Sequence, residues 1–291
     1  MNVKILIATN FLFMMVIGEL LAESLKIEGS STVRPIVQKA SKVFLTENTD
    51  VEFNISGGGS SHGIESAATG DVNIGMASRD FKKTEMKKWD GLVTHKIGID
   101  GIAVIVNRWN PIKGITKKQI QDIFTGKITN WKEFGGPDLP IKIISLEEGR
   151  SSLDLFNKFF SLESRQVGKG KHRYTTHRVI GSEHYSKAKA RTIGPNRDVI
   201  SNVAFYKNCI GYVSIGTAQD IFFKGGRIKL LPLDGVKASV ENVSTGKYLL
   251  RHTLNLITPG PPTGKAREFI DFLTSFKGQK IVSGLGFVPI K

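Results

Sequence analysis

Cysteine is almost absent from this sequence, whose 291 residues include only Cys209. A single cysteine cannot form an internal disulfide or a cysteine zinc site, which excludes disulfide scaffolds, zinc fingers and iron–sulfur proteins. His172, His177 and His184 lie close together in the sequence, but their spacing fits no recognised metal-ligand set and no carboxylate cluster accompanies them. We therefore expect no metal and no other cofactor. The chemistry has to come from oxygen, nitrogen and backbone groups.

Long hydrophobic runs are also absent. Residues 5–17 are mostly apolar, but Asn10 interrupts this stretch and Glu19 follows it closely, and a membrane span needs about 20 apolar residues. A positively charged start precedes it and the small residue Ala22 follows it, so residues 1–22 resemble a secretory signal peptide cleaved near Ala22. An uncleaved membrane anchor is the alternative. We expect an exported mature protein, soluble in the periplasm.

Acidic residues are few beside basic ones. The chain has 41 Lys and Arg against 26 Asp and Glu, a formal net charge of +15, which indicates anionic partners. Basic residues are concentrated in residues 165–191, where only Tyr174 and Tyr185 are interleaved with them. A nucleic-acid surface would carry more aromatic rings to stack on bases. We therefore expect a solvated loop or helix face here and no nucleic-acid partner, with a basic nucleic-acid binder kept as an alternative.

Three segments predict a strand followed by a helix that opens on hydroxyl groups. The first turn of a helix leaves backbone N–H groups unpaired at the positive end of the helix dipole, so such a start can bind an anion. Ser and Thr are also ordinary N-caps, so one start alone indicates little. Three together predict a shared site for one small tetrahedral oxyanion, in a cleft where two sheet edges face each other. The predicted strands and the segments that follow them are 25–28 with 29–32, 51–55 with 56–61, and 141–144 with 147–152.

One short motif favours a different chemistry. Residues 59–63 match the Gly-x-Ser-x-Gly pattern of a nucleophile elbow. In that interpretation Ser61 is the nucleophile of a serine esterase or phosphatase, with Asp198 and His252 as its partners. The pattern is short, lies early in the chain and has no oxyanion-hole glycine run before it, so we keep it as the alternative from another functional class.

Seven segments, which occur in order over nearly the whole mature chain, carry a resemblance to a known family. The sequence resembles the shorter branch of the phosphate-binding PstS proteins, the extracytoplasmic receptors of phosphate ABC transporters. The segments are 29–35 (GSSTVRP), 57–64 (GGGSSHGI), 74–79 (IGMASR), 100–107 (DGIAVIVN), 123–131 (IFTGKITNW), 210–214 (IGYVS) and 278–282 (GQKIV).

The resemblance implies an α/β, two-lobe type II periplasmic-binding-protein fold that closes on one phosphate. The extended apolar stretches 99–107 and 248–258 are the expected crossover segments between the lobes. The first lobe would comprise 24–105 plus 249–291, and the second 106–248. The implied function is a monomeric, non-enzymatic receptor that passes inorganic phosphate to the membrane permease of the transporter. A receptor for another oxyanion, such as sulfate, molybdate or arsenate, is the alternative.

The resemblance also implies contact residues for phosphate at each junction. The expected pairs are Ser31 with Thr32, Ser60 with Ser61, and Ser151 with Ser152.

The chain departs from the family pattern at two places. At the third junction the family usually has Glu-Gly-Ser-Gly-Thr-Arg with a further arginine shortly before it, whereas this chain has an arginine at position 150 and Leu146 at the earlier place. We therefore expect Arg150 to supply the positive charge. Longer relatives place an aspartate after the matching Ala-Ser, where this chain has Arg79. We expect Arg79 to contact phosphate and Asp100 to accept the phosphate proton.

Overall fold

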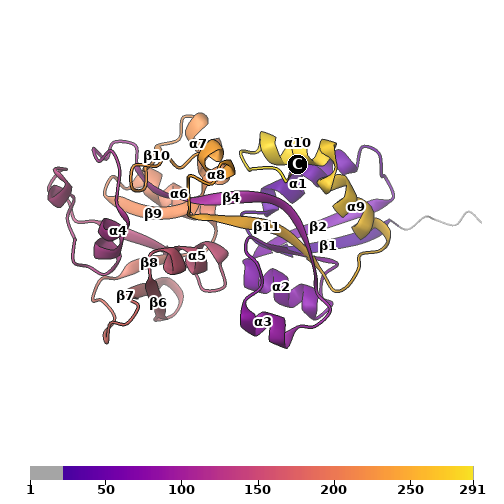
Figure 1. The fold of residues 1–291 in the computed structure, drawn as a ribbon, viewed down its shortest axis with the longest axis horizontal. Coiled ribbons are helices and arrows are strands. Elements are labelled where there is room, and N and C mark those ends of the chain that lie inside the picture. Colours follow the sequence, from indigo (N-terminus) through magenta and orange to yellow (C-terminus); the bar gives the residue numbers. More distant parts are fainter. Residues whose placement is uncertain (1–21, 291) are drawn as a thin grey trace, which may run out of the picture.

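The computed structural model describes residues 22–290 of the chain (Figure 1). The predicted leader, residues 1–22, lies outside the described residues except for Ala22. In the part that is described, no helix is both long enough and apolar enough to cross a membrane. Strands and helices alternate along most of the chain, so the predicted α/β class is confirmed.

The strands form one mixed sheet. Their bounds are Glu23–Gly29 (β1), Val51–Gly58 (β2), Ile74–Ala77 (β3), Val93–Asn107 (β4), Lys142–Leu146 (β5), Leu162–Val167 (β6), Tyr174–Val179 (β7), Ala190–Ile193 (β8), Cys209–Ser214 (β9), Ile228–Leu230 (β10) and Arg251–Thr258 (β11). Their order across the sheet is β2-β1-β3-β11-β4-β9-β5-β8-β7-β6, and β10 pairs with β4. β1 is parallel to β2 and β3, whereas β11 is antiparallel to β3 and β4.

Helices cover both faces of this sheet. Their bounds are Arg34–Phe44 (α1), Ser60–Ala68 (α2), Lys83–Lys88 (α3), Lys117–Phe124 (α4), Ser151–Phe159 (α5), Asn196–Phe205 (α6), Ile215–Phe223 (α7), Val240–Ser244 (α8), Gly264–Thr274 (α9) and Phe276–Gly284 (α10), with 3-10 turns at Trp131–Phe134 and Gly170–His172. Figure 1 shows α1, α9 and α10 on one side of β1 and β2, and α2 with α3 on the other.

β4 and β11 join the two halves of the molecule. The first part of β4, residues 93–101, pairs with β11, and its second part, residues 102–106, pairs with β9. Residues 102–106 are fully buried, as the apolar pattern of the predicted crossover 99–107 requires. Figure 1 shows both strands running between the halves. The two predicted crossover segments are therefore confirmed.

Each half has its own hydrophobic core. One core is built from β1, α1, α9 and α10, and the other from β5, β9 and helices α4 to α7. Along the chain, core membership changes between Ile97 and Ile102 and again between Leu250 and Leu254. We propose the division that the sequence suggested, and call residues 24–105 plus 249–291 the first lobe and residues 106–248 the second lobe. Residues 102–105, Leu250 and Val288 of the first lobe pack in the core of the second.

The three predicted strand-to-helix junctions are confirmed. Helix α1 follows β1, α2 follows β2 and α5 follows β5. Pro35 lies in the first turn of α1, where its missing N–H costs no helical hydrogen bond. Gly59, just before α2, has a φ of 97°, a conformation that residues with a Cβ rarely adopt. The chain can therefore turn sharply from β2 into α2.

Candidate functional site

A small cavity lies between the lobes where the helix starts meet. Its volume is about 10 Å³, which is roughly the room that one water molecule needs. The starts of α1, α2 and α5 contribute to its wall, and so does the start of α6, which was not among the predicted junctions. The lining residues are Ser30, Ser31, Thr32, Gly59, Ser60, Ser78, Leu146, Arg150, Ser151, Ser152 and Asn196.

Most of the predicted contact residues reach this cavity. The predicted residues outside its wall are Ser61, Arg79 and Asp100, and those that line it are Ser31, Thr32, Ser60, Arg150, Ser151 and Ser152.

Buried hydroxyl groups of the first lobe hold one another in place. Ser30 Oγ donates to Ser78 Oγ at 3.0 Å, and the backbone N–H of Ser78 donates to Ser60 Oγ at 3.0 Å. All three residues are buried. Ser30 and Ser78 were not among the predicted contacts. Ser78 could have been found, since it follows β3 directly and meets the same rule of a hydroxyl at the carboxyl end of a strand.

The two lobes touch around the cavity. Ser151 of the second lobe donates a hydroxyl hydrogen bond to Ser60 of the first, and Asn196 Nδ2 donates to Thr32 Oγ1 at 3.1 Å. A Cβ added at Gly59 would lie only 3.1 Å from the carbonyl oxygen of Gly149 in the other lobe. Glycine at position 59 therefore permits the close approach of the lobes as well as the sharp turn.

The helix starts also present backbone N–H groups. Within residues 22–290, the backbone N–H groups of Ser31, Ser60, Ser151 and Ser152 have no hydrogen-bond acceptor. The residues directly before α1, α2 and α5 form no side-chain capping bond, whereas Ser30 Oγ accepts from the N–H groups of Thr32 at 3.2 Å and Val33 at 3.4 Å. Unpaired N–H groups at a helix start carry the positive end of the helix dipole. The wall of the cavity is therefore rich in donors and suited to an anion.

Arg150 is the one charged residue in the wall of this cavity, all of whose lining residues are described. Its Nη2 donates to Glu147 Oε2 at 3.0 Å, and Glu147 also accepts a hydrogen bond from Arg173. Burial raises the pKa of Glu147, but the hydrogen bond from Arg150 and the charges of both arginines more than offset this, so its pKa lies below the ordinary value. One carboxylate shared by two guanidinium groups leaves a net positive charge beside the cavity.

Arg79 lies behind the cavity. Each of its Nη atoms lies 2.6 Å from a carboxylate oxygen of Glu85, and Nη2 also donates to Ser61 Oγ at 2.9 Å. Across the boundary between the lobes, Asp154 Oδ2 lies 3.5 Å from Arg79 Nε and 2.7 Å from Lys82 Nζ. Glu85 thus neutralises Arg79, and the group forms an ion-pair network between the lobes.

Asp100 is buried between β4, β11 and the start of α7. Its Oδ1 accepts from the backbone N–H of Gly216 at 3.2 Å, and its Oδ2 lies 3.7 Å from Nε2 of His252, its cross-strand neighbour. His252 Nδ1 is hydrogen-bonded to the carbonyl oxygen of Ser78. The Asp100 carboxylate therefore reaches the cavity wall only through His252 and the backbone of Ser78.

Ser61 has no catalytic arrangement among the described residues. Its hydroxyl accepts a hydrogen bond from Arg79, which can donate but cannot take a proton. The neighbouring His62 pairs with Glu28 at 2.8 Å, and His252 bonds a backbone carbonyl. A serine nucleophile needs an adjacent base to accept its proton. The geometry gives the esterase alternative no support.

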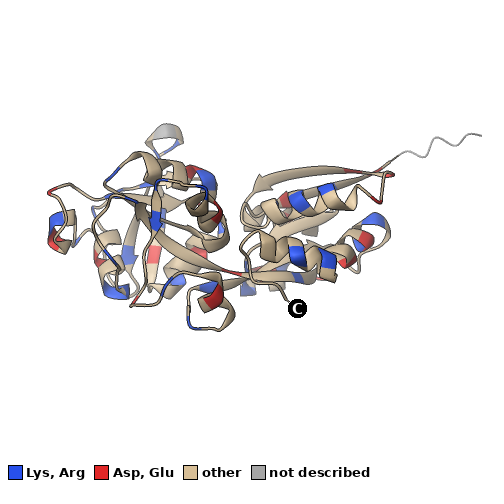
Figure 2. Cartoon of the chain, turned by 90° about the horizontal axis from the view of Figure 1, so that it is seen from above, with Lys and Arg blue, Asp and Glu red and all other residues tan. Residues whose placement is uncertain are grey.

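The basic segment 165–191 was expected to be a loop or helix face, and the structure agrees for residues 168–173 and 180–189, which form loops and a 3-10 turn, but not for the rest. It contains the end of β6 and all of β7, which pair with each other as antiparallel strands. The guanidinium carbon of Arg165 lies 4.6 Å from the ring centre of Tyr185, so this ring already stacks against a cation of its own chain. Figure 2 shows lysines and arginines on both lobes, not on this segment alone.

Comparison with known proteins finds relatives that all belong to one group of solute-binding proteins. Residues 18–277 match the PBP superfamily domain. The chain is similar to the phosphate-binding protein PstS of Bacillus subtilis (strain 168), with 32% identity over 268 residues that cover 92% of this chain and 81% of that protein. It is also similar to PstS of Borreliella burgdorferi, with 28% identity over 271 residues that cover 91% of this chain and 89% of that protein.

A solved structure agrees with these relatives. It is a Clostridium perfringens protein, named as a phosphate ABC transporter substrate-binding protein and crystallised with bound phosphate. The two proteins are 33% identical, and their superposition has a TM-score of 0.79 and covers 92% of this chain and 100% of the other. The two-lobe type II periplasmic-binding-protein architecture is thereby confirmed.

Proposed function

This chain belongs to the PstS family of phosphate-binding proteins within the PBP superfamily, and from this membership we propose that it is an extracytoplasmic receptor for inorganic phosphate. It binds phosphate between its lobes, passes it to the membrane permease of an ABC transporter and catalyses no reaction. The observation that carries the proposal is the convergence of helix starts from both lobes on one wall of hydroxyls, N–H groups and a single arginine.

The chemistry of that wall matches a small oxyanion. All four phosphate oxygens accept hydrogen bonds, and the wall offers serine and threonine hydroxyls, unpaired N–H groups and the Arg150 guanidinium. Hydrogen bonds to a charged partner contribute about 1.5–3 kcal/mol each. A few of them, made in a site that excludes water, suffice for tight binding.

We assign the direct contacts to the predicted residues that line the cavity. Phosphate is larger than one water molecule, so the lobes have to part before it enters, and bending at β4 and β11 provides this motion. The hydrogen bond between Ser60 and Ser151 is then replaced by bonds from both hydroxyls to the anion. The assigned contacts are Ser31, Thr32, Ser60, Arg150, Ser151 and Ser152.

Three further predicted residues support this wall from behind. Ser61 and Arg79 brace the start of α2 and connect it to Asp154 in the second lobe. Asp100 holds His252, which in turn holds the Ser78 carbonyl. We propose that these residues affect phosphate affinity through position, without touching the ligand.

A receptor for another tetrahedral oxyanion is the second candidate, and one observation favours it. No carboxylate lines the cavity, all of whose lining residues are described. A carboxylate would accept a hydrogen bond from protonated phosphate, but sulfate carries no proton to donate to it. Rejection of the unprotonated anions sulfate and molybdate is therefore not built into the wall by a charged acceptor.

Calorimetric titration tests both candidates. The mature protein is first unfolded and refolded to remove carried-over ligand, and is then titrated with phosphate, sulfate and molybdate. We expect phosphate to bind most tightly and to raise the free energy of unfolding by about 2.7 kcal/mol when present at a hundred times its Kd. No heat and no thermal shift at millimolar phosphate would refute the receptor function. Tighter binding of sulfate or molybdate would select the second candidate.

We also propose that the mature receptor is a monomer in the periplasm, released from its leader near Ala22. Intact-mass measurement of the protein from a periplasmic extract would report the cleavage position. Light scattering of the same sample would report the oligomeric state, and a dimer would contradict the proposal.

A further inference from the structure

A series of adjoining cavities leads from the buried cavity to the molecular surface. A middle cavity of about 210 Å³ shares Ser31 and Asn196 with the buried one. An outer groove of about 740 Å³ shares Pro35, Gln38 and Arg197 with the middle one. Neighbouring cavities thus share wall residues, and we call the three together the path.

Unpaired positive charge lines this path. Arg34 and Arg197 line the middle cavity, and Lys39 and Lys42 line the outer groove, where Glu52 is the one carboxylate outside the Lys224–Asp220 pair. None of these four side chains forms an ion pair with a carboxylate of residues 22–290. Lys224, which also lines the outer groove, differs from them because it is paired: its Nζ lies 2.7 Å from Asp220 Oδ1.

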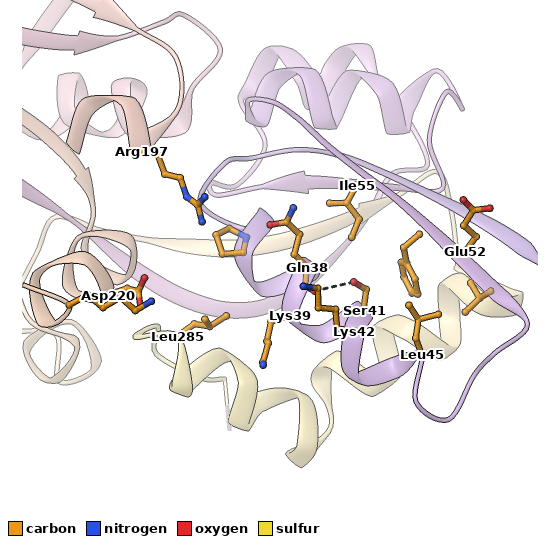
Figure 3. A pocket seen from close by; sticks show the side chains of 14 residues that line it. Gln38, Lys39, Ser41, Lys42, Leu45, Glu52, Ile55, Arg197, Asp220 and Leu285 are labelled. Carbon is orange, nitrogen blue, oxygen red and sulfur yellow. Dashed lines mark hydrogen bonds and ion pairs between the residues drawn. The ribbon is translucent and has the colours of Figure 1, made fainter. Parts of the chain in front are cut away.

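The two arginines approach the path from opposite lobes. Arg34 is the first residue of α1 in the first lobe, and Arg197 follows Asn196 at the start of α6 in the second. Figure 3 shows Arg197 extending from its helix toward Gln38 of α1. Each arginine is thus within two residues of a residue that lines the buried cavity, Thr32 for one and Asn196 for the other.

We infer that this path is the entry route for phosphate and that Arg34 and Arg197 form an outer anion site on it. The inference rests on the proposed function. Guanidinium groups bind phosphate oxygens well because their paired donors match the oxyanion geometry. Like charges along a low-dielectric groove raise the local anion concentration and speed association. The outer site collects phosphate from solution, and the buried wall then retains it.

The outer site should affect the association rate constant of phosphate, which distinguishes it from the buried wall. Arg34→Gln combined with Arg197→Gln should lower the association rate constant about tenfold at an ionic strength of about 20 mM. The dissociation rate constant should change little. The difference between parent and variant should shrink as salt is raised, because added ions screen the exposed guanidinium charges.

Stopped-flow fluorescence can measure these rates on the mature chain. A cysteine introduced as Lys83→Cys carries an environment-sensitive dye at the boundary between the lobes, next to Lys82, which pairs with Asp154 of the second lobe. Labelling is selective because Cys209 is buried. The matched control is Arg165→Gln combined with Arg267→Gln, which removes the same charge from exposed positions off the path. We expect the control to keep the association rate of the parent to within about twofold.

The outcomes separate the two proposals. Equal association rates for the path variant and the control would overturn the entry route, and so would a path variant that changes only the dissociation rate, since the arginines would then belong to the buried wall. If the labelled parent gave no phosphate response and calorimetry on the unlabelled chain showed no binding, the receptor function itself would fail.

Discussion

His177 makes the second lobe sensitive to acid. This residue of β7 is fully buried, and its ring packs edge-on against Phe124 with 5.2 Å between the ring centres. Neither ring nitrogen has a hydrogen-bond partner among the described residues. Burial lowers the pKa of His177 from 6.5 to about 4, because the charged form would lose its hydration without gaining a partner. The folded protein therefore keeps this imidazole neutral.

The sign and size of the effect follow from proton linkage. Above pH 6.5 both folded and unfolded His177 are neutral, and stability does not depend on it. Below pH 6.5 His177 binds a proton in the unfolded chain but stays neutral in the folded chain. The free energy of unfolding therefore falls by about 1.4 kcal/mol per pH unit. The loss amounts to about 2 kcal/mol by pH 5 and levels off at about 3 kcal/mol near pH 4.

Urea unfolding of His177→Phe between pH 7 and pH 5 tests this reasoning. The phenyl ring is larger and shifts stability by a constant amount at every pH, so the slope with pH is the informative quantity. We expect the variant to lose about 2 kcal/mol less than the parent over this interval. His184→Phe is the matched control, since His184 is 92% exposed, and it should keep the parental slope. A parental slope in His177→Phe would refute the buried neutral histidine.

Three further outcomes test the site by titration with phosphate. Ser60→Ala and Ser152→Ala, one in each lobe, should each weaken binding about ten- to a hundredfold; an effect confined to Ser60→Ala would place the anion in the first lobe alone. Asp154→Asn removes the carboxylate that faces Lys82 across the lobes, and should weaken binding by less than about tenfold, with a less compact bound state by X-ray scattering. Asp100→Asn should lower the melting temperature and leave the ratio of sulfate to phosphate affinity unchanged. A tenfold change in that ratio would support the direct contact between Asp100 and phosphate that the sequence predicted.

The sequence predicted the features that depend on short stretches of chain. The junction before α2 could be foreseen because a β pattern, glycines, hydroxyls and a helical pattern follow one another within residues 51–68. The same local logic gave the apolar crossover in β4, whose residues are buried on both faces.

Features that depend on distant partners could not be foreseen. Arg79 was expected to contact phosphate from the family resemblance, and nothing in the sequence shows that Glu85 meets both of its Nη atoms. Asp100 lies on a strand whose two faces are both buried, so alternation did not reveal that it points toward His252. Arg173 looked like one of many basic residues, and only the fold brings it to Glu147.

The first lobe is made from segments near both ends of the chain, and this has a consequence for its folding during the export that we propose. Its core joins Leu25 and Val37 to Phe269 and Phe287, whereas the second core lacks only Leu250 and Val288 when the chain stops at residue 248. A chain that emerges with its N-terminus first can therefore complete the inserted lobe early, by contacts that are nearer in sequence. The N-terminal strands have to wait for α9 and α10. A chain released too early would present one finished lobe and an exposed apolar sheet, which is a target for proteases and a seed for aggregation.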